Sequence, residues 1–215
     1  MPIFTVGVLI AVIAAIVALG RTKDPVRRAR SLRKAGLILM MAFSAFIAAF
    51  IVGETFTDPG GWKAVGYVAT WLVPVAALAW IAWFRPGPAV IASAALLVGV
   101  FVLDLWSAVA SDAWRSFEDS VGPVRAIITF AIAAPLALLG WKRPFAAGVM
   151  LLLMMVPPTI LVATGTGAIG GALLAAASPG SVTGVLYLLA ARFEAEAADS
   201  HAAPTAGRRC RGPRE

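Results

Sequence analysis

The sequence predicts an all-α protein, a polytopic bundle of transmembrane helices, and three observations carry this prediction. Hydrophobic residues make up 60% of the 215 residues, and the mean hydropathy is +0.89. Charged residues make up only 13%, whereas soluble domains contain roughly 25%, so polar surface is too scarce to cover a soluble globule of this size. Finally, seven apolar stretches alternate with segments that contain Lys and Arg.

Each apolar stretch is long enough to cross a bilayer, because about 20 helical residues span roughly 30 Å of hydrocarbon. We predict spans at residues 3–20, 35–53, 62–84, 89–106, 124–140, 145–163 and about 168–191. Gly170, Gly171, Pro179 and Gly180 interrupt the seventh stretch. Six spans, with the last segment re-entrant or interfacial, therefore stay open as an alternative.

The first stretch resembles a signal peptide in length but not in charge. A signal peptide has a positive region before its apolar stretch, whereas residues 1–20 contain no Lys or Arg and the basic cluster follows them. We therefore expect the first helix to be retained as a span.

The distribution of basic residues predicts the orientation, because Lys and Arg are enriched in cytoplasmic loops. Placing loop 21–34 in the cytoplasm leaves only Lys63, Arg115 and Arg125 on the opposite face. Fifteen of the 18 basic residues then lie inside: Arg21, Lys23, Arg27, Arg28, Arg30, Arg33, Lys34, Arg85, Lys142, Arg143, Arg192, Arg208, Arg209, Arg211 and Arg214. The prediction is seven spans, with the N-terminus outside and the C-terminus cytoplasmic.

The tryptophans are distributed as this topology requires, since indole rings favour the headgroup layer. Two groups lie near the predicted boundaries: Trp62, Tyr67, Trp106 and Trp114 at the outer one, and Trp83 and Trp141 at the inner one. Trp71 and Trp80 lie deeper, and we expect them to pack between helices.

Local signals predict how the helices begin and connect. Asp24-Pro25 has the form of an N-cap followed by proline at the first helical position, so residues 25–34 are predicted to run as a basic helix into the second span. This basic segment suits an anionic inner leaflet, and a nucleic-acid role is not favoured. In the outer loop 107–122, Ala110, Trp114, Phe117 and Val121 fall at helical spacing, which predicts a short amphipathic helix.

Two cytoplasmic turns resemble each other. Residues 83–86 read Trp-Phe-Arg-Pro and residues 141–144 read Trp-Lys-Arg-Pro, each between two apolar helices at an offset of 58. Duplicated hairpins occur in transporters, but aromatic, basic and proline residues also suit any turn at the inner leaflet. Both explanations stay open.

The chain divides into a helix bundle, residues 1–191, and a largely disordered basic tail, residues 192–215. Residues 193–199 could extend the last helix by a turn or two, while residues 201–215 are rich in Ala, Pro, Gly and Arg without apolar periodicity. His201 and Cys210, the single His and the single Cys, both lie in this tail.

These observations exclude several kinds of chemistry and leave no cofactor to predict. One histidine cannot supply paired haem ligands or a histidine-based zinc site, and no lysine lies inside a span to form a retinal Schiff base. No phosphate-binding glycine loop is present. We therefore name no catalytic residue, and the sequence favours a non-enzymatic role. The outer carboxylates Asp112, Glu118 and Asp119 lack a surrounding motif that would support a lipid-modifying enzyme.

Two features remain as candidate sites. Glu54, Asp104 and Arg125 are the ionisable residues nearest the hydrocarbon, where a charge is costly and is usually paired; we predict an Asp104–Arg125 pair, structural or part of an outward-opening ion site. Pro157 and Pro158 predict a break in the sixth span, because two backbone donors are missing there. Small-residue pairs such as Gly167/Gly171 and Gly180/Gly184 predict close helix packing.

The predicted function is that of an accessory, assembly or interaction subunit of a membrane complex. Its partners would be the lipid bilayer with an anionic inner leaflet and other membrane subunits. The alternative is a small-solute or ion transporter component that uses the broken sixth helix and the outer-end charges. The Ala-, Gly- and Arg-rich composition, with only four Lys, indicates a high-GC bacterial genome and hence a bacterial cytoplasmic membrane.

Overall fold

The computed structural model is all-helical in the residues it describes, which are 24–57, 61–110, 112–114, 116, 124–154, 156 and 168–208. Within these ranges the side chains at 107–108, 124–127, 129–130, 168–178 and 201–208 are not described. The predicted first span and Pro157-Pro158 lie outside the described residues.

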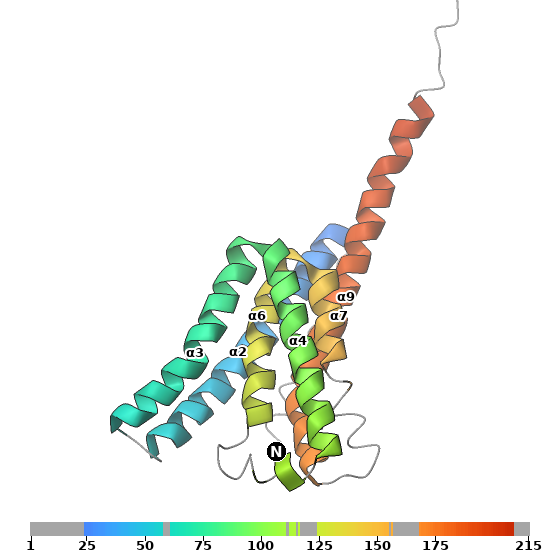
Figure 1. The fold of residues 1–215 in the computed structure, drawn as a ribbon. Helices are drawn as coiled ribbons and strands as arrows, with labels where there is room; N and C mark the ends of the chain where they lie inside the picture. The colour runs from blue at the N-terminus through green and yellow to red at the C-terminus, as the bar shows by residue number, and fades with distance from the viewer. Residues whose placement is uncertain are drawn as a thin grey trace, which may run out of the picture.

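Six helices make up most of the described chain (Figure 1). They are α2 (Pro25–Thr57), α3 (Gly61–Phe84), α4 (Pro86–Val109), α6 (Val124–Lys142), α7 (Pro144–Leu153) and α9 (Ala168–Arg208). Three of them, α2, α3 and α4 as far as Trp106, are long and apolar enough to cross a membrane. The membrane-protein class is therefore supported by helix length and composition.

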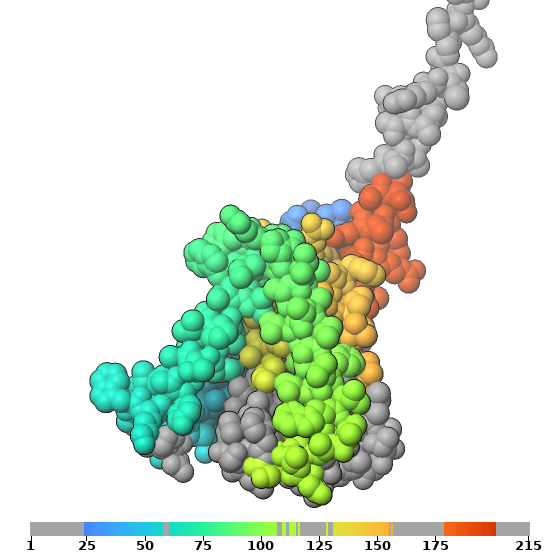
Figure 2. Space-filling view, viewed as in Figure 1, coloured from blue at the N-terminus to red at the C-terminus, as the bar shows by residue number. Residues whose placement is uncertain are grey.

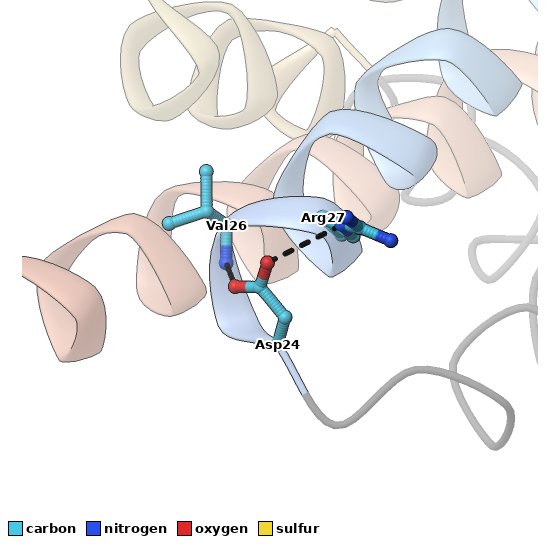
Figure 3. A network of polar contacts seen from close by, with 3 residues as sticks. All are labelled: Asp24, Val26 and Arg27. Atoms are coloured by element: carbon cyan, nitrogen blue, oxygen red, sulfur yellow. Dashed lines mark hydrogen bonds and ion pairs between the residues drawn. The ribbon is translucent and has the colours of Figure 1, made fainter.

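The predicted start of α2 is confirmed. Asp24 precedes the helix, and its Oδ1 accepts a hydrogen bond from the Val26 N–H at 3.0 Å (Figure 3). Pro25 occupies the first helical position. The Arg27 guanidinium lies 3.6 Å from the Asp24 carboxylate, an exposed contact that contributes little stability. From this cap the helix runs unbroken through the basic segment into the apolar one, as predicted.

Helix α6 forms the centre of the bundle, with α2, α3, α4 and α7 packed around it (Figure 1). Its buried residues belong to one apolar core: Ile132, Ala133, Leu136, Ala137 and Leu139. A second, smaller core joins Ala29 and Leu32 of α2 to Leu186 and Ala190 of α9. The C-terminal end of α2 and the N-terminal end of α3 diverge from this body (Figure 1).

The two predicted turns have the same backbone geometry. Arg85 joins α3 to α4 with φ −133° and ψ 74°, and Arg143 joins α6 to α7 with φ −134° and ψ 71°. Each donates its N–H to the carbonyl four residues earlier at 2.7 Å, and each accepts from the alanine four residues later at 3.1–3.2 Å. Proline follows each turn at the first helical position, where a backbone N–H would have no acceptor within the helix, so its absence costs no hydrogen bond.

The last helix is longer and more regular than the sequence indicated. The backbone of α9 is helical from Ala168 to Arg208, and Pro179 and Gly180 lie buried within it. Residues 192–208, which we assigned to a largely disordered tail, are therefore helical. Alanine has the highest helix propensity, and the Arg192 Nε donates to the Glu196 carboxylate one turn on at 3.0 Å.

One expectation about tryptophan is corrected. Trp80, expected between helices, is 66% exposed and lies 4.3 Å from Phe84, ring centre to ring centre. Trp114 is only 4% exposed and packs edge-to-face on Trp106 at 5.2 Å, and the position of both rings at the outer boundary stays a prediction. Of the predicted outer segment 107–122, residues 107–109 belong to α4, and residues 110, 112–114 and 116 are also described, 112–114 as a helical turn. Phe117 and Val121 lie outside the described residues.

Candidate functional site

The three predicted polar residues lie on three different helices. Glu54 is exposed near the C-terminal end of α2, whereas Asp104 is 7% exposed on α4. Arg125 lies in the first turn of α6, and its side chain is not described. At about 1.5 Å per residue, Asp104 lies about 28 Å along α4 from the turn at Arg85, and Arg125 lies about 27 Å along α6 from the turn at Arg143. Since α4 packs against α6, these similar distances place the two backbones at a similar height. The ion pair itself stays a prediction.

Asp104 belongs to a mixed polar and apolar stripe on the buried face of α4. Ala89, Ser93, Leu97, Val100 and Asp104 recur every three or four residues, and all are buried. Ser93 is 1% exposed, and its hydroxyl has no hydrogen-bond partner among the described residues. In the described residues, no group of three or more His, Cys, Asp or Glu side chains is placed to hold a metal ion.

Arg33 lies where α2, α6 and α9 meet and contacts both of the other helices. Its Nη1 donates to the Trp141 carbonyl at 3.0 Å, and its Nη2 pairs with the Glu194 carboxylate. The guanidinium also lies 5.9 Å from the centre of the Trp141 ring. Because Trp141 lies in the last turn of α6, Arg33 satisfies a carbonyl that has no donor within its own helix.

Sequence reasoning treated Arg33 only as one of many inside charges. A signal did exist, since Arg33 falls four residues after Ala29 and three before Gly36, on the face of α2 that packs against other helices. Arg28 also turns toward α9, with its guanidinium 5.7 Å from the Phe193 ring. The basic segment is therefore divided into residues that join helices and residues that face outward.

Tyr187 is a second junction that the sequence did not reveal. Its side chain is fully buried, and its hydroxyl donates to the Ala137 carbonyl of α6 at 2.7 Å. The ring fills a space left by two glycines: a Cβ on Gly36 would lie 3.0 Å from it, and a Cβ on Gly140 would overlap it. Three helices thus meet around one aromatic ring.

Close packing at Gly184 agrees with the small-residue prediction. A Cβ on Gly184 would lie 3.0 Å from the Gly148 carbonyl oxygen, and a Cβ on Gly148 would lie 2.9 Å from the Gly184 carbonyl oxygen. A Cβ on the neighbouring Gly180 would lie 4.0 Å from the Leu151 side chain of α7, an ordinary contact distance. Small residues allow α7 and α9 to approach closely, which is the usual source of helix association in lipid.

Comparison with protein-family models, with curated proteins and with solved structures gave no match.

Proposed function

We propose that this chain is a multi-pass protein of a bacterial cytoplasmic membrane and acts as an interaction subunit of a membrane complex. In this proposal seven helices span the bilayer, the N-terminus lies outside, and the basic end with the C-terminus faces an anionic inner leaflet. Helix α3 is the surface on which a partner helix docks. The proposal includes no nucleic-acid partner and no reaction.

The supporting observation is the contrast between α3 and α6. Most residues of α6 from Ile132 to Gly140 are buried, whereas α3 buries only Ala64, Leu78 and Ala82. Figure 2 shows α3 at the side of the molecule, with its outer half standing clear of the bundle. Lipid accepts an apolar helix, so exposure alone does not indicate a partner.

The composition of the exposed α3 face does indicate one. Gly66, Thr70, Pro74 and Ala77 are all exposed and recur every three or four residues, a small-residue pattern that permits close approach of a second helix. Nothing lies within 4 Å of a Cβ built on Gly66. Pro74 also lacks an N–H, so it cannot give the Thr70 carbonyl the usual helical hydrogen bond from four residues on.

An unpaired carbonyl within a span is costly, because lipid offers no hydrogen-bond donor. A partner helix with a Ser, Thr or Asn side chain could donate a hydrogen bond to the Thr70 carbonyl. The exposed face of α4, by contrast, presents Val98, Val102 and Leu105, which suit lipid chains.

Site-specific photo-crosslinking in native membranes tests this proposal. A photoreactive residue at Thr70 or Ala77 should give one discrete protein adduct, while the matched control at Val98 of α4 should give lipid adducts only. Gly66→Leu should abolish the Ala77 adduct without lowering stability, since the site is open. Lipid adducts alone from both α3 positions would refute α3 as a docking surface.

A transporter component is the second candidate, and the two prolines that follow α7 favour it. The helix as described contains 10 residues, Pro144–Leu153, and Pro157 and Pro158 follow it outside the described residues. Pro157 and Pro158 cannot donate to the carbonyls of Leu153 and Met154. Broken helices of this kind line binding sites in several transporters.

Solute flux separates the two candidates. If the chain transports, liposomes containing it should show flux of a small solute or cation, and the Pro157→Ala/Pro158→Ala variant should change that flux. Flux that is present in the parent and unchanged in the double variant would exclude a role for this break in transport. The interaction proposal predicts no flux from the isolated chain.

A further inference from the structure

We propose that the outward face of α2 binds one anionic phospholipid of the inner leaflet, with its headgroup held by Arg30 and Lys34 and an acyl chain along Ile38 and Met41. This is a discrete site, distinct from general attraction to the membrane, and it does not depend on what docks at α3. The supporting observation is that some basic residues of α2 contact other helices while others remain exposed on the opposite face.

The basic segment has two faces with different roles. Arg28 and Arg33 turn toward α9 and α6, where they contact Phe193, Glu194 and Trp141. Arg30 and Lys34 are exposed on the other face, and neither has an ion-pair partner in the described part of the chain. Two cations one turn apart therefore stand free at the surface.

The same face continues as an apolar surface toward the membrane. Ile38 is 67% exposed and Met41 is 39% exposed. At about 100° per residue, Arg27, Arg30, Lys34, Ile38 and Met41 all fall within roughly 100° of arc, opposite the buried face of Leu32, Gly36 and Met40. A single stripe thus changes from charged to apolar along the helix, as a phospholipid does along its length.

The depth of the stripe follows from the bond between Arg33 and Trp141, which places this part of α2 level with the end of α6. Arg30 lies about 6 Å from Lys34 along the helix, so both fit within a headgroup layer about 5–7 Å thick. Ile38 lies about 6 Å from Lys34 in the opposite direction, among the acyl chains. Arg27 is further out and shares its charge with Asp24, so it contributes less.

Charge and shape together select the ligand. Two free cations match a phosphodiester with a second negative charge or a neutral polyol headgroup, and they disfavour a zwitterion, whose own cation would be repelled. The apolar continuation distinguishes a lipid from free phosphate, which has nothing to place against Ile38 and Met41. We therefore assign the site to an anionic phospholipid such as phosphatidylglycerol.

Native mass spectrometry of the full chain tests the assignment, with phosphatidylglycerol and phosphatidylcholine as probes. Arg30→Gln/Lys34→Gln should weaken phosphatidylglycerol binding about thirtyfold, at about 1 kcal/mol per basic residue. The matched control, Arg85→Gln/Arg143→Gln, removes the same charge at the same end from exposed turn positions and should retain binding. Inorganic phosphate should not compete.

Two further variants keep the test decisive. Arg30→Lys preserves the charge and should retain binding, whereas Ile38→Ser keeps both cations and should weaken binding of long-chain more than short-chain phosphatidylglycerol. Equal losses in the Arg30/Lys34 variant and the Arg85/Arg143 control would show diffuse attraction and overturn the site. Equal affinity for phosphatidylcholine in the parent would overturn it as well.

Discussion

Gly140→Ala is expected to lower the free energy of unfolding by about 1–3 kcal/mol, the range for overpacking a core. The single added carbon would overlap the Tyr187 ring, which is held by its hydrogen bond to the Ala137 carbonyl. Alanine is the better helix former by about 1 kcal/mol. The clash with Tyr187 therefore outweighs a gain that the same change would give at an open position.

Gly99→Ala is the matched control, since nothing lies within 4 Å of a Cβ at that position of α4. It should be neutral or stabilising. Combining Gly140→Ala with Tyr187→Ala should cost less than the sum of the two single changes, because the clash is then removed. Equal stability of Gly140→Ala and Gly99→Ala in a detergent unfolding series would contradict the three-helix junction.

Asp104→Ala should destabilise the protein by on the order of 3–5 kcal/mol if Asp104 pairs with Arg125, because the change would leave a buried guanidinium without its counterion. The carboxylate is on a residue only 7% exposed, so solvent cannot replace the lost partner. The double change to alanine should recover part of this loss. Thermal unfolding of the two single variants and the double variant measures the coupling, and strictly additive effects would contradict the pair.

The sequence predicted the helical class and several local features because these depend on short-range chemistry. Asp24 and Pro25 form a helix start through their own backbone and side chain. Arg85 and Arg143 end one helix and begin the next because proline follows each of them. Such signals act within four residues and need no knowledge of the fold.

The junctions at Arg33 and Tyr187 could not be predicted, because each depends on residues more than 40 positions away. Tyr187 bonds to Ala137, and Arg33 bonds to Trp141. Helical spacing separates Arg33 from Arg30 on the surface of α2, but it does not show which residues of α6 and α9 lie beside Arg33. The prediction for Trp80 was wrong because an apolar residue in a span can face lipid or protein at little difference in free energy.

The continuous helix of α9 shows a different limit. Pro179 and Gly180 were interpreted as interruptions, but both lie within the continuous helix, and the neighbouring Gly184 with Gly148 allows α7 to approach α9. In a membrane, small residues serve packing as often as they break helices. The extension to Arg208 is a matter of alanine content, which outweighs the lack of apolar periodicity.

The central claim is that this is a membrane-embedded bundle whose basic end faces the cytoplasm, and reporter fusions measure it directly. Fusions at Arg33, Arg143 and the C-terminus should all report the cytoplasm, and fusions near Asp58 and Ser116 should report the outside. This follows from the concentration of 15 of 18 basic residues on one predicted face. A C-terminal reporter found outside would contradict the seven-span threading, and a reporter at Arg33 found outside would contradict the lipid site on α2 as well.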